Sequence, residues 1–148
     1  MERISKNFTY EEFERSATAT ANNINNRMPA SVKPAVRALA VNLLQPLCDA
    51  EGWNDLISSG YRCDALNKLV GGVDTSQHRK GEAADNKFYE TVNGKKVMVQ
   101  PIRVARAVID LGLVFDQMIL YPTFVHLSYS GTNRMQVLYN KRYKGPRL

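Results

Sequence analysis

The longest run of regularly spaced apolar residues begins at Ser31. Its apolar residues recur every three or four positions, which predicts one face of a long helix: Val36, Leu39, Ala40, Leu43, Leu44 and Leu47. Pro34 falls in the first turn, where a missing N–H is harmless, whereas Pro46 is expected to kink the helix near its end. Another substantial helix is expected to open at Pro101 and to end at Gly112.

An earlier helix start lies in the stretch FTYEEF. Thr9 and Glu12 have the spacing of a capping box, and Phe8 and Phe13 occupy the positions of a hydrophobic staple. The polar stretch at residues 19–30 predicts a loop between this helix and the long one.

Runs rich in β-branched and aromatic residues mark the expected strands. Two are expected at residues 55–62 and 82–90, separated by a helix that begins at Asp64 and ends at the glycine pair 71–72. The dipeptide Asn93–Gly94 predicts a hairpin turn. Three later runs predict consecutive antiparallel strands: residues 114–121, 124–130 and 134–140. Because helices come first and most strands last, the pattern predicts a single α+β domain over residues 1–148.

Length and composition are those of an ordinary globular domain. The chain has 148 residues, enough to bury a core. No apolar run approaches the ~20 residues of a membrane span, and the N-terminus lacks the apolar region of a secretory signal. We therefore expect synthesis in the cytoplasm, no membrane insertion and a monomer. The two cysteines, Cys48 and Cys63, lie in no metal-binding spacing and are expected to be reduced, buried and inert.

The chain is basic, with a formal net charge of +6 and a pI near 9.4. This charge favours an anionic partner, such as nucleic acid, an anionic membrane or the anionic polymers of a bacterial cell wall. The last residues, KRYKGPRL, concentrate part of the charge; we expect a solubilising, partly frayed end, with a binding tail as the alternative. No nucleic-acid motif is present, so nucleic acid is the least favoured partner.

The candidate chemistry lies around the two histidines of the chain, His78 and His126. A catalytic zinc site uses three protein ligands and leaves a fourth position for water, and His78, Asp85 and His126 would supply that set. The spacing requires Gly81 to bend the chain between His78 and Asp85. His126 lies in an apolar strand, where an unpartnered imidazole would be costly to bury. The alternative is that each histidine is a satisfied polar residue without a metal.

Several motifs in order carry a resemblance over residues 8–139: SGYR, LNKLVGG, SQHRKGEAAD, FDQMI and VHLSYS. Together they resemble the D-alanyl-D-alanine carboxypeptidase-like family of zinc peptidases, whose members cleave peptidoglycan stem peptides. Many members are bacteriophage or prophage endolysins. The resemblance implies a hedgehog/DD-peptidase-like fold, in which helices pack on a small antiparallel sheet that carries the metal.

The resemblance also implies roles for particular residues. His78, Asp85 and His126 become the zinc ligands, and Arg62 becomes the cation that holds a substrate carboxylate or the developing oxyanion. Ser76 would help to position the substrate or the site.

The sequence departs from the family in one respect. Members commonly carry an acid a few residues before the last histidine as general base, whereas ILYPTFVH contains none. Asp116 is the nearest upstream carboxylate, and one hairpin register would place it on the same face as His126, while a slip of one residue would place it on the opposite face. We take Asp116 as the candidate base. Glu82 is a second candidate, and Tyr121 is a poor base at its usual pKa of ~10.

Two functions remain open under this resemblance. The first is zinc-dependent hydrolysis of a peptide bond in peptidoglycan, either a D-Ala-D-Ala carboxypeptidase or an L-Ala-D-Glu endopeptidase reaction, by a phage or prophage lytic enzyme released through a separate pore. The second is a catalytically weak or inactive wall-binding or phage structural module that retains the fold. The missing acid is the reason for keeping the second.

Overall fold

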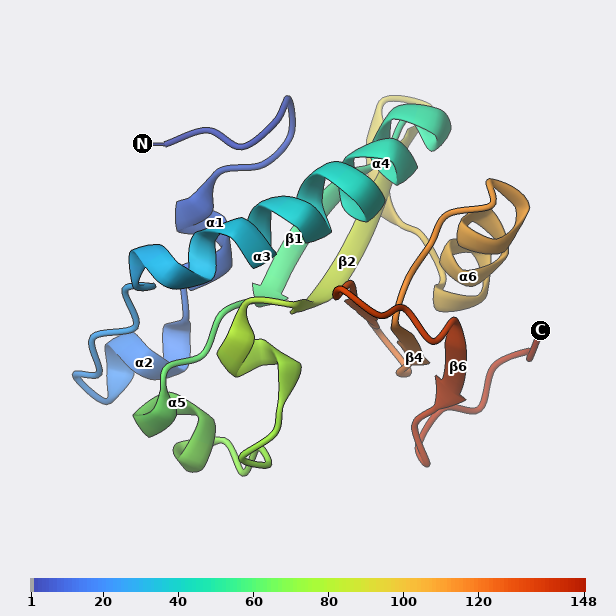
Figure 1. Ribbon diagram of the computed structural model, residues 1–148. Coiled ribbons are helices and arrows are strands. Elements are labelled where there is room, and N and C mark those ends of the chain that lie inside the picture. The colour runs from blue at the N-terminus through green and yellow to red at the C-terminus, as the bar shows by residue number, and fades with distance from the viewer. Residues whose placement is uncertain (1) are drawn as a thin grey trace.

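The computed structural model describes residues 2–148, which form a mixed sheet with helices against it (Figure 1). The strand order is β1-β2-β5-β4-β6, and β3 pairs with β2 beside this path. The strands are β1 (Asn54–Ser59), β2 (Ala83–Val92), β3 (Lys95–Met98), β4 (Gln117–Leu120), β5 (Val125–Ser128) and β6 (Gln136–Tyr139). The predicted α+β class is confirmed.

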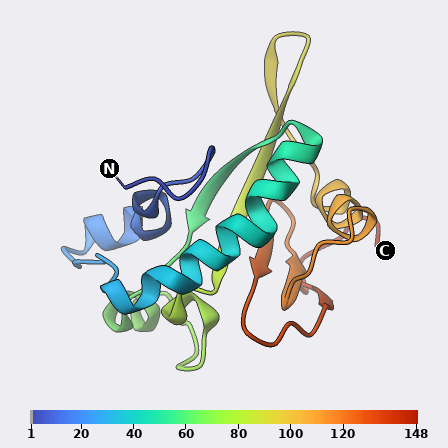
Figure 2. The ribbon, with the colours of Figure 1, turned by 45° about the horizontal axis from the view of Figure 1, so that its top comes forward.

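A long helical segment lies diagonally across β1 and β2 in both views (Figures 1 and 2). It consists of η1 (Ala30–Val32), α3 (Lys33–Leu39), η2 (Ala40–Leu44) and α4 (Gln45–Glu51). The other helices are α1 (Tyr10–Glu14), α2 (Ala17–Ala21), α5 (Asp64–Leu69), the 3₁₀ turn η3 (Gln77–Lys80) and α6 (Pro101–Asp110). None of the helices formed by residues 2–148 is long and apolar enough to cross a membrane.

The N-terminal helix signals are confirmed. The Glu12 carboxylate accepts a hydrogen bond of 2.9 Å from the Thr9 backbone N–H, and the Phe8 and Phe13 rings lie 5.9 Å apart. The loop expected at residues 19–30 is partly wrong, because α2 extends into it. Ser16 begins that helix by accepting a hydrogen bond from the Ala19 backbone N–H.

Pro46 is preceded by an irregular, wider turn in the long helical segment. The segment η2 is π-helical, and at its end the Gln45 backbone N–H donates to the Ala40 carbonyl, five residues back. Proline donates no such bond and its ring crowds the preceding turn, so a widened turn before Pro46 relieves the conflict. The expected irregularity is therefore present as a wide turn.

The sheet differs from the expected antiparallel one at β6, which pairs with β4 in parallel. One edge of β5 is occupied by β4 and the other by β2, so a following strand has no free edge beside β5. The chain after β5 instead passes to the start of β4, where the Gln136 N–H donates to the Asp116 carbonyl. Starting from that end, β6 must run in the direction of β4.

The Asn93–Gly94 hairpin is confirmed, with φ values of 51° and 77° at its two turn residues. The hairpin of β2 and β3 projects beyond the rest of the molecule (Figure 2).

Two expectations about less regular features have different outcomes. Cys48 and Cys63 form no disulfide; Cys48 is buried, which raises the pKa of its thiol, and Cys63 is half-buried. The partly frayed C-terminus stays a prediction: residues 144–148 are exposed, while Tyr143 is buried and the Leu148 backbone N–H donates to the Tyr139 hydroxyl at 2.8 Å. The last residues therefore contact Tyr139 of β6 and are otherwise exposed.

Alternation along the strands gives the sheet two different faces. Ala84 and Phe88 of β2, together with Leu127 of β5, point into the hydrophobic core with the long helix. Successive side chains of a strand point to opposite faces, so Asp85 and His126 project from the other face. The helices thus build the core on one side and leave the other side of the sheet for chemistry.

Candidate metal centre

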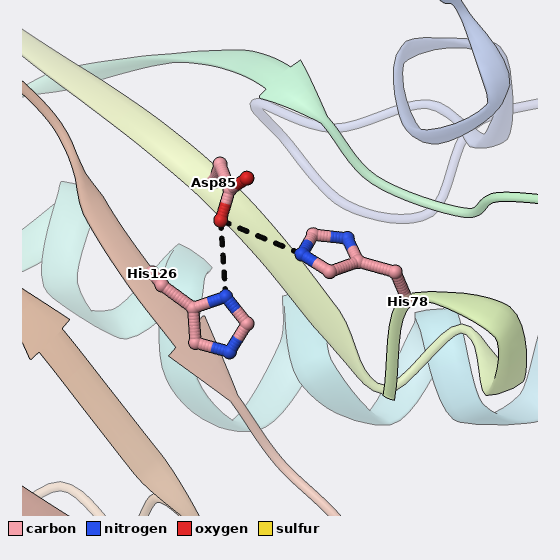
Figure 3. A group of neighbouring side chains, drawn as sticks. All are labelled: His78, Asp85 and His126. Carbon is pink, nitrogen blue, oxygen red and sulfur yellow. Dashed lines mark hydrogen bonds and ion pairs between the residues drawn. The ribbon is translucent and has the colours of Figure 1, made fainter. Parts of the chain in front are cut away.

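Three side chains that can ligate a metal converge on the sheet face opposite the core (Figure 3). Asp85 comes from β2, His126 from β5 and His78 from η3. One carboxylate oxygen, Asp85 Oδ1, lies 3.0 Å from His126 Nδ1 and 3.5 Å from His78 Nε2. The ligand atoms of the three residues all lie within 4.8 Å of one another. The structure thus brings together the three residues that the sequence selects.

The short turn between His78 and Asp85 depends on Gly81. This residue ends η3 with φ +74°, a left-handed conformation that side chains other than glycine adopt at a cost. A Cβ atom here would also meet Val32 and Val36 of the long helical segment. Gly81 therefore lets the chain turn and pack closely at the same point, and the turn carries His78 back over Asp85.

His78 is fixed by its backbone and side-chain partners. Its Nδ1 lies 2.7 Å from the Gly60 carbonyl oxygen, which can only accept, so Nδ1 carries a hydrogen, and the other ring nitrogen, Nε2, faces Asp85. The Arg62 backbone N–H donates to the His78 carbonyl at 3.0 Å, and Ser76 Oγ accepts from the His78 backbone N–H at 3.3 Å. These bonds join the SGYR and SQHRKGEAAD motifs into one unit.

Asp85 is held as an anion. Burial by itself would raise the pKa of this carboxyl, but hydrogen bonds to His126 and His78 outweigh that cost and place the pKa below its usual range. An ionised, partly buried carboxylate beside two imidazoles can bind a metal cation.

Arg62 lies at the same site with an unused donor. Burial lowers the pKa of its guanidinium, while the nearby charge of Asp85 and the Tyr121 phenol oppose that shift. Its Nε is buried and has no hydrogen-bond partner among residues 2–148. A Cβ on Gly72 would lie 3.0 Å from Arg62 Nη1 and would clash with Asn67, so the second glycine of LNKLVGG makes room for the arginine.

The converging residues line an open cavity of about 450 Å³. Its lining, within the described chain, is Arg62, Val73, Thr75, Ser76, Gln77, His78, Asp85, Gln117, Ile119, Tyr121, His126 and Arg134. Asp85 is the only acid in that set, beside two arginines. A larger cavity of about 520 Å³ near α1 and α2 has no histidine or cysteine in its lining. The candidate metal ligands therefore lie in the cavity of about 450 Å³.

The register of β4 against β5 decides where Asp116 lies. Ile119 pairs directly with His126, so the odd-numbered residues of β4 point to the same face of the sheet as His126. Asp116 is even-numbered, and the same alternation directs it toward the opposite face. The Asp116 carboxylate accepts from Arg134 Nε at 2.9 Å, Arg134 Nη2 at 3.0 Å and Gln77 Nε2 at 2.8 Å. The Arg134 hydrogen bonds lower its pKa to about 2. Such a carboxylate is a poor proton acceptor near neutral pH, so the geometry disfavours Asp116 as general base.

The two other candidate bases differ in position. Glu82 lies outside the cavity lining, and its carboxylate accepts from Gln77 Nε2 at 3.3 Å. Tyr121 lies in the lining, where burial and the negative charge of Asp85 raise its pKa and Arg62 lowers it. A neutral phenol in this place is a hydrogen-bond donor to an oxyanion and not a base at neutral pH.

Sequence reasoning missed three residues that build the site. Buried Asn26 donates to the Tyr61 carbonyl at 2.9 Å and accepts from the Cys63 N–H at 2.8 Å, which fixes the segment around Arg62. Gln77 and Arg134 line the cavity and both bind Asp116. Asn26 stands among similar asparagines in NNINNR, and Arg134 lies far along the chain from the ligand motifs, so neither carried a local signal.

The fold and the site together define a class of protein. An α+β domain with two imidazoles and a carboxylate converging in an open cavity, beside a half-buried arginine, is typical of a mononuclear metallohydrolase. The sequence model of the Peptidase M15 family matches residues 6–128, and the chain belongs to this family of metallopeptidases. A comparison with curated proteins found no significant match.

The residues present fit the divalent metal of such a peptidase. Two imidazole nitrogens and a carboxylate oxygen form a three-ligand set of the kind that catalytic zinc uses, and a fourth position remains for water. The hydrogen bond from His78 to the Gly60 carbonyl is the outer partner that usually orients a ligating histidine. The group formed by His78, Asp85 and His126 can therefore bind a metal.

Proposed function

We propose that this protein is a zinc-dependent peptidase that hydrolyses a peptide bond in bacterial peptidoglycan. The observation that carries the proposal is the convergence of His78, Asp85 and His126 within 4.8 Å, in an open cavity, in a chain of the Peptidase M15 family. A D-Ala-D-Ala carboxypeptidase and an L-Ala-D-Glu endopeptidase reaction both fit. Release of a phage or prophage lytic enzyme through a separate pore remains part of the proposal.

In this proposal the side chains of His78, Asp85 and His126 would hold zinc, which when bound would lower the pKa of a water and polarise the scissile carbonyl. Arg62 supplies positive charge to the developing oxyanion or to a substrate carboxylate, since its buried Nε has no other partner within the described chain. Tyr121 donates its phenol hydrogen to the same region. Ser76 keeps the first ligand in place through the His78 backbone N–H.

The second candidate function is a wall-binding or phage structural module that retains the fold. The specific observation in its favour is that Asp85 is the only acid in the cavity lining formed by residues 2–148, which leaves no free carboxylate to accept a proton from water. Loss of a general base typically costs about 10²–10⁴ in rate. The rate at which peptide ends are released therefore distinguishes a slow peptidase from a binding module.

The test is mass spectrometry of fragments released from purified peptidoglycan by zinc-loaded protein, beside a chelated control and the variant His78→Ala. We expect new peptide ends in the first sample alone, and their masses will identify the bond that is cut. Binding to peptidoglycan with zinc bound and no new ends over long incubation would support the module instead. Full release by His78→Ala would contradict the peptidase proposal.

A further inference from the structure

The cavity contains a second cation in addition to Arg62. Arg134 follows β5 in the loop before β6, and its side chain reaches the cavity lining. The guanidinium offers Nε and Nη2 to the Asp116 carboxylate at 2.9 Å and 3.0 Å, and the Arg134 backbone N–H donates to the same carboxylate at 2.9 Å. This paired arrangement fixes the plane of the guanidinium.

The anchor of this arginine is itself rigid. The side chain of Asp116 is 3% exposed, and Gln77 Nε2 donates to its second oxygen at 2.8 Å. Gln77 immediately precedes the ligand His78, so the anchor is tied to the metal-binding turn. Arg134 is thus held at a fixed distance from the place where hydrolysis is proposed.

The outer part of Arg134 remains available to a ligand. Its side chain is 55% exposed, and Nη1 has no hydrogen-bond partner among residues 2–148. The side-on pairing with Asp116 uses only one edge of the guanidinium, and an arginine can offer its other edge to a second carboxylate. Asp85 is the only acid in the described lining of the cavity and belongs to the metal group, so no protein anion competes for that edge there.

Resting on the proposed function, we propose that Arg134 is a specificity-determining residue that binds a carboxylate of the peptide substrate, and that Asp116 is the positioning residue that holds it. The substrate class is then a peptide with a free carboxylate beyond the group that Arg62 engages. That carboxylate is either on a side chain or at the C-terminus. Asp116 acts through Arg134 and takes no proton from water.

The probes are four synthetic stem peptides that vary two groups independently. The α-carboxylate of the D-Glu residue is free or amidated, and the C-terminus is a free acid or an amide. Binding to the zinc-loaded protein is measured by calorimetry under conditions in which the peptide remains uncut over the titration, as checked by mass spectrometry. The pair of peptides that differ in affinity identifies the source of the carboxylate.

The wild type should bind the peptide with one of the free carboxylates about 10- to 100-fold more tightly than the matched amide. This ratio of Kd values corresponds to the loss of one hydrogen bond to a charged group. Arg134→Gln should abolish that preference and Arg134→Lys should keep part of it. Arg106→Gln, an exposed arginine on α6, is the matched control and should bind as the wild type does. Asp116→Asn should weaken the preference without removing zinc binding.

An unchanged preference in Arg134→Gln overturns this proposal, as does equal binding, or no binding, of all four probes by the wild type. These results are separate from a failure of the proposed function. A preference that depends on Arg134 in a protein that releases no peptide ends would keep the carboxylate site and remove the peptidase. Release of peptide ends with no dependence on Arg134 would do the reverse.

Discussion

Asp85 and His126 are directly opposite partners in the antiparallel pairing of β2 and β5, and their side chains meet at 3.0 Å on the face away from the core. Directly opposite residues of an antiparallel pair have adjacent Cβ atoms, so the backbone register alone places the carboxylate beside the imidazole. Two of the three candidate ligands are thus set by the sheet. Only His78 needs a turn to reach them, and it is held there by hydrogen bonds to the Ser76 hydroxyl and to the Gly60 carbonyl that follows β1.

Replacing Asp85 tests this arrangement directly. Loss of an outer-shell partner typically weakens metal binding by about 10- to 100-fold. Asp85→Asn should weaken zinc binding by more than that, because it removes the only anionic ligand. The readout is the rise in melting temperature with added zinc, which follows ligand concentration over Kd. Asp110→Asn, an exposed acid at the end of α6, is the control. A wild-type response in Asp85→Asn would rule out this metal centre.

Gly81→Ala should destabilise the protein by more than about 1 kcal/mol. The residue has φ +74°, and the added Cβ would meet Val32 and Val36, so strain and a steric clash combine. Chemical denaturation measures the free energy of unfolding.

The matched control for Gly81→Ala is Gly94→Ala in the β2–β3 hairpin. Gly94 has a similar φ of +77°, but nothing lies within 4 Å of the place where its Cβ would be. This variant should pay the conformational cost alone, about 1 kcal/mol. Equal losses in the two variants would mean that close packing against the long helix is not what Gly81 provides.

Asp116 predicts a pH dependence of stability. Its pKa of about 2 in the folded protein lies below the ordinary value of about 3.9, so folding favours the ionised form. The stabilisation is fully present above about pH 4 and is lost as the pH falls toward 2. We expect about 1 to 2 kcal/mol at neutral pH, a reduced figure because the Arg134 side chain is more than half exposed.

The measurement is the difference in unfolding free energy between the wild type and Asp116→Asn across this pH range. Asparagine does not titrate, so the difference should shrink as the pH falls from 4 to 2. Asp74→Asn, an exposed acid, is the control for general acid effects. A difference that stays constant with pH would show that the Asp116 charge contributes nothing to folding.

The sequence predicted those parts of the fold that depend on local patterns. The staple of Phe8 and Phe13 and the turn at Asn93–Gly94 require only residues close in the chain, and both are confirmed. The parallel placement of β6 depends on which sheet edges are already occupied, and no local pattern carries that information. The helix α2 was missed because alanine and threonine in a polar stretch give no apolar face.

In the candidate site, too, local motifs predicted some residues, whereas contacts between distant segments could not be predicted. His78, Asp85 and Arg62 lie in short motifs with few alternatives, and the structure brings them together with His126. The position of Asp116 could not be decided from sequence, because a slip of one residue in the β4–β5 register changes its face. Its partner Arg134 is separated from it by a hairpin and a loop, and that contact exists only in the folded chain.

The charge of the chain makes a prediction about adsorption to the cell wall. A net charge of +6 should concentrate the protein on anionic wall polymers, and added salt should screen that attraction. Pelleting with purified cell walls at increasing sodium chloride should therefore show falling retention. Retention that does not change with salt would indicate that adsorption depends on contacts other than net charge.

Tyr121 allows the missing base to be tested by restoring one. It lies in the cavity lining close enough to Asp85 and Arg62 for their charges to act on its phenol, and it has the odd-numbered parity of the β4 residues that face the metal group. If hydrolysis is slow because no carboxylate accepts the proton of water, Tyr121→Glu should release peptide about 10²–10⁴ faster than Tyr121→Gln. Both variants lose the phenol that is proposed to donate to the oxyanion, and glutamine has the shape of glutamate without a base, so the comparison isolates the carboxylate. A Tyr121→Glu variant that binds zinc as the wild type does and hydrolyses no faster than Tyr121→Gln would show that proton transfer to a carboxylate does not limit this protein.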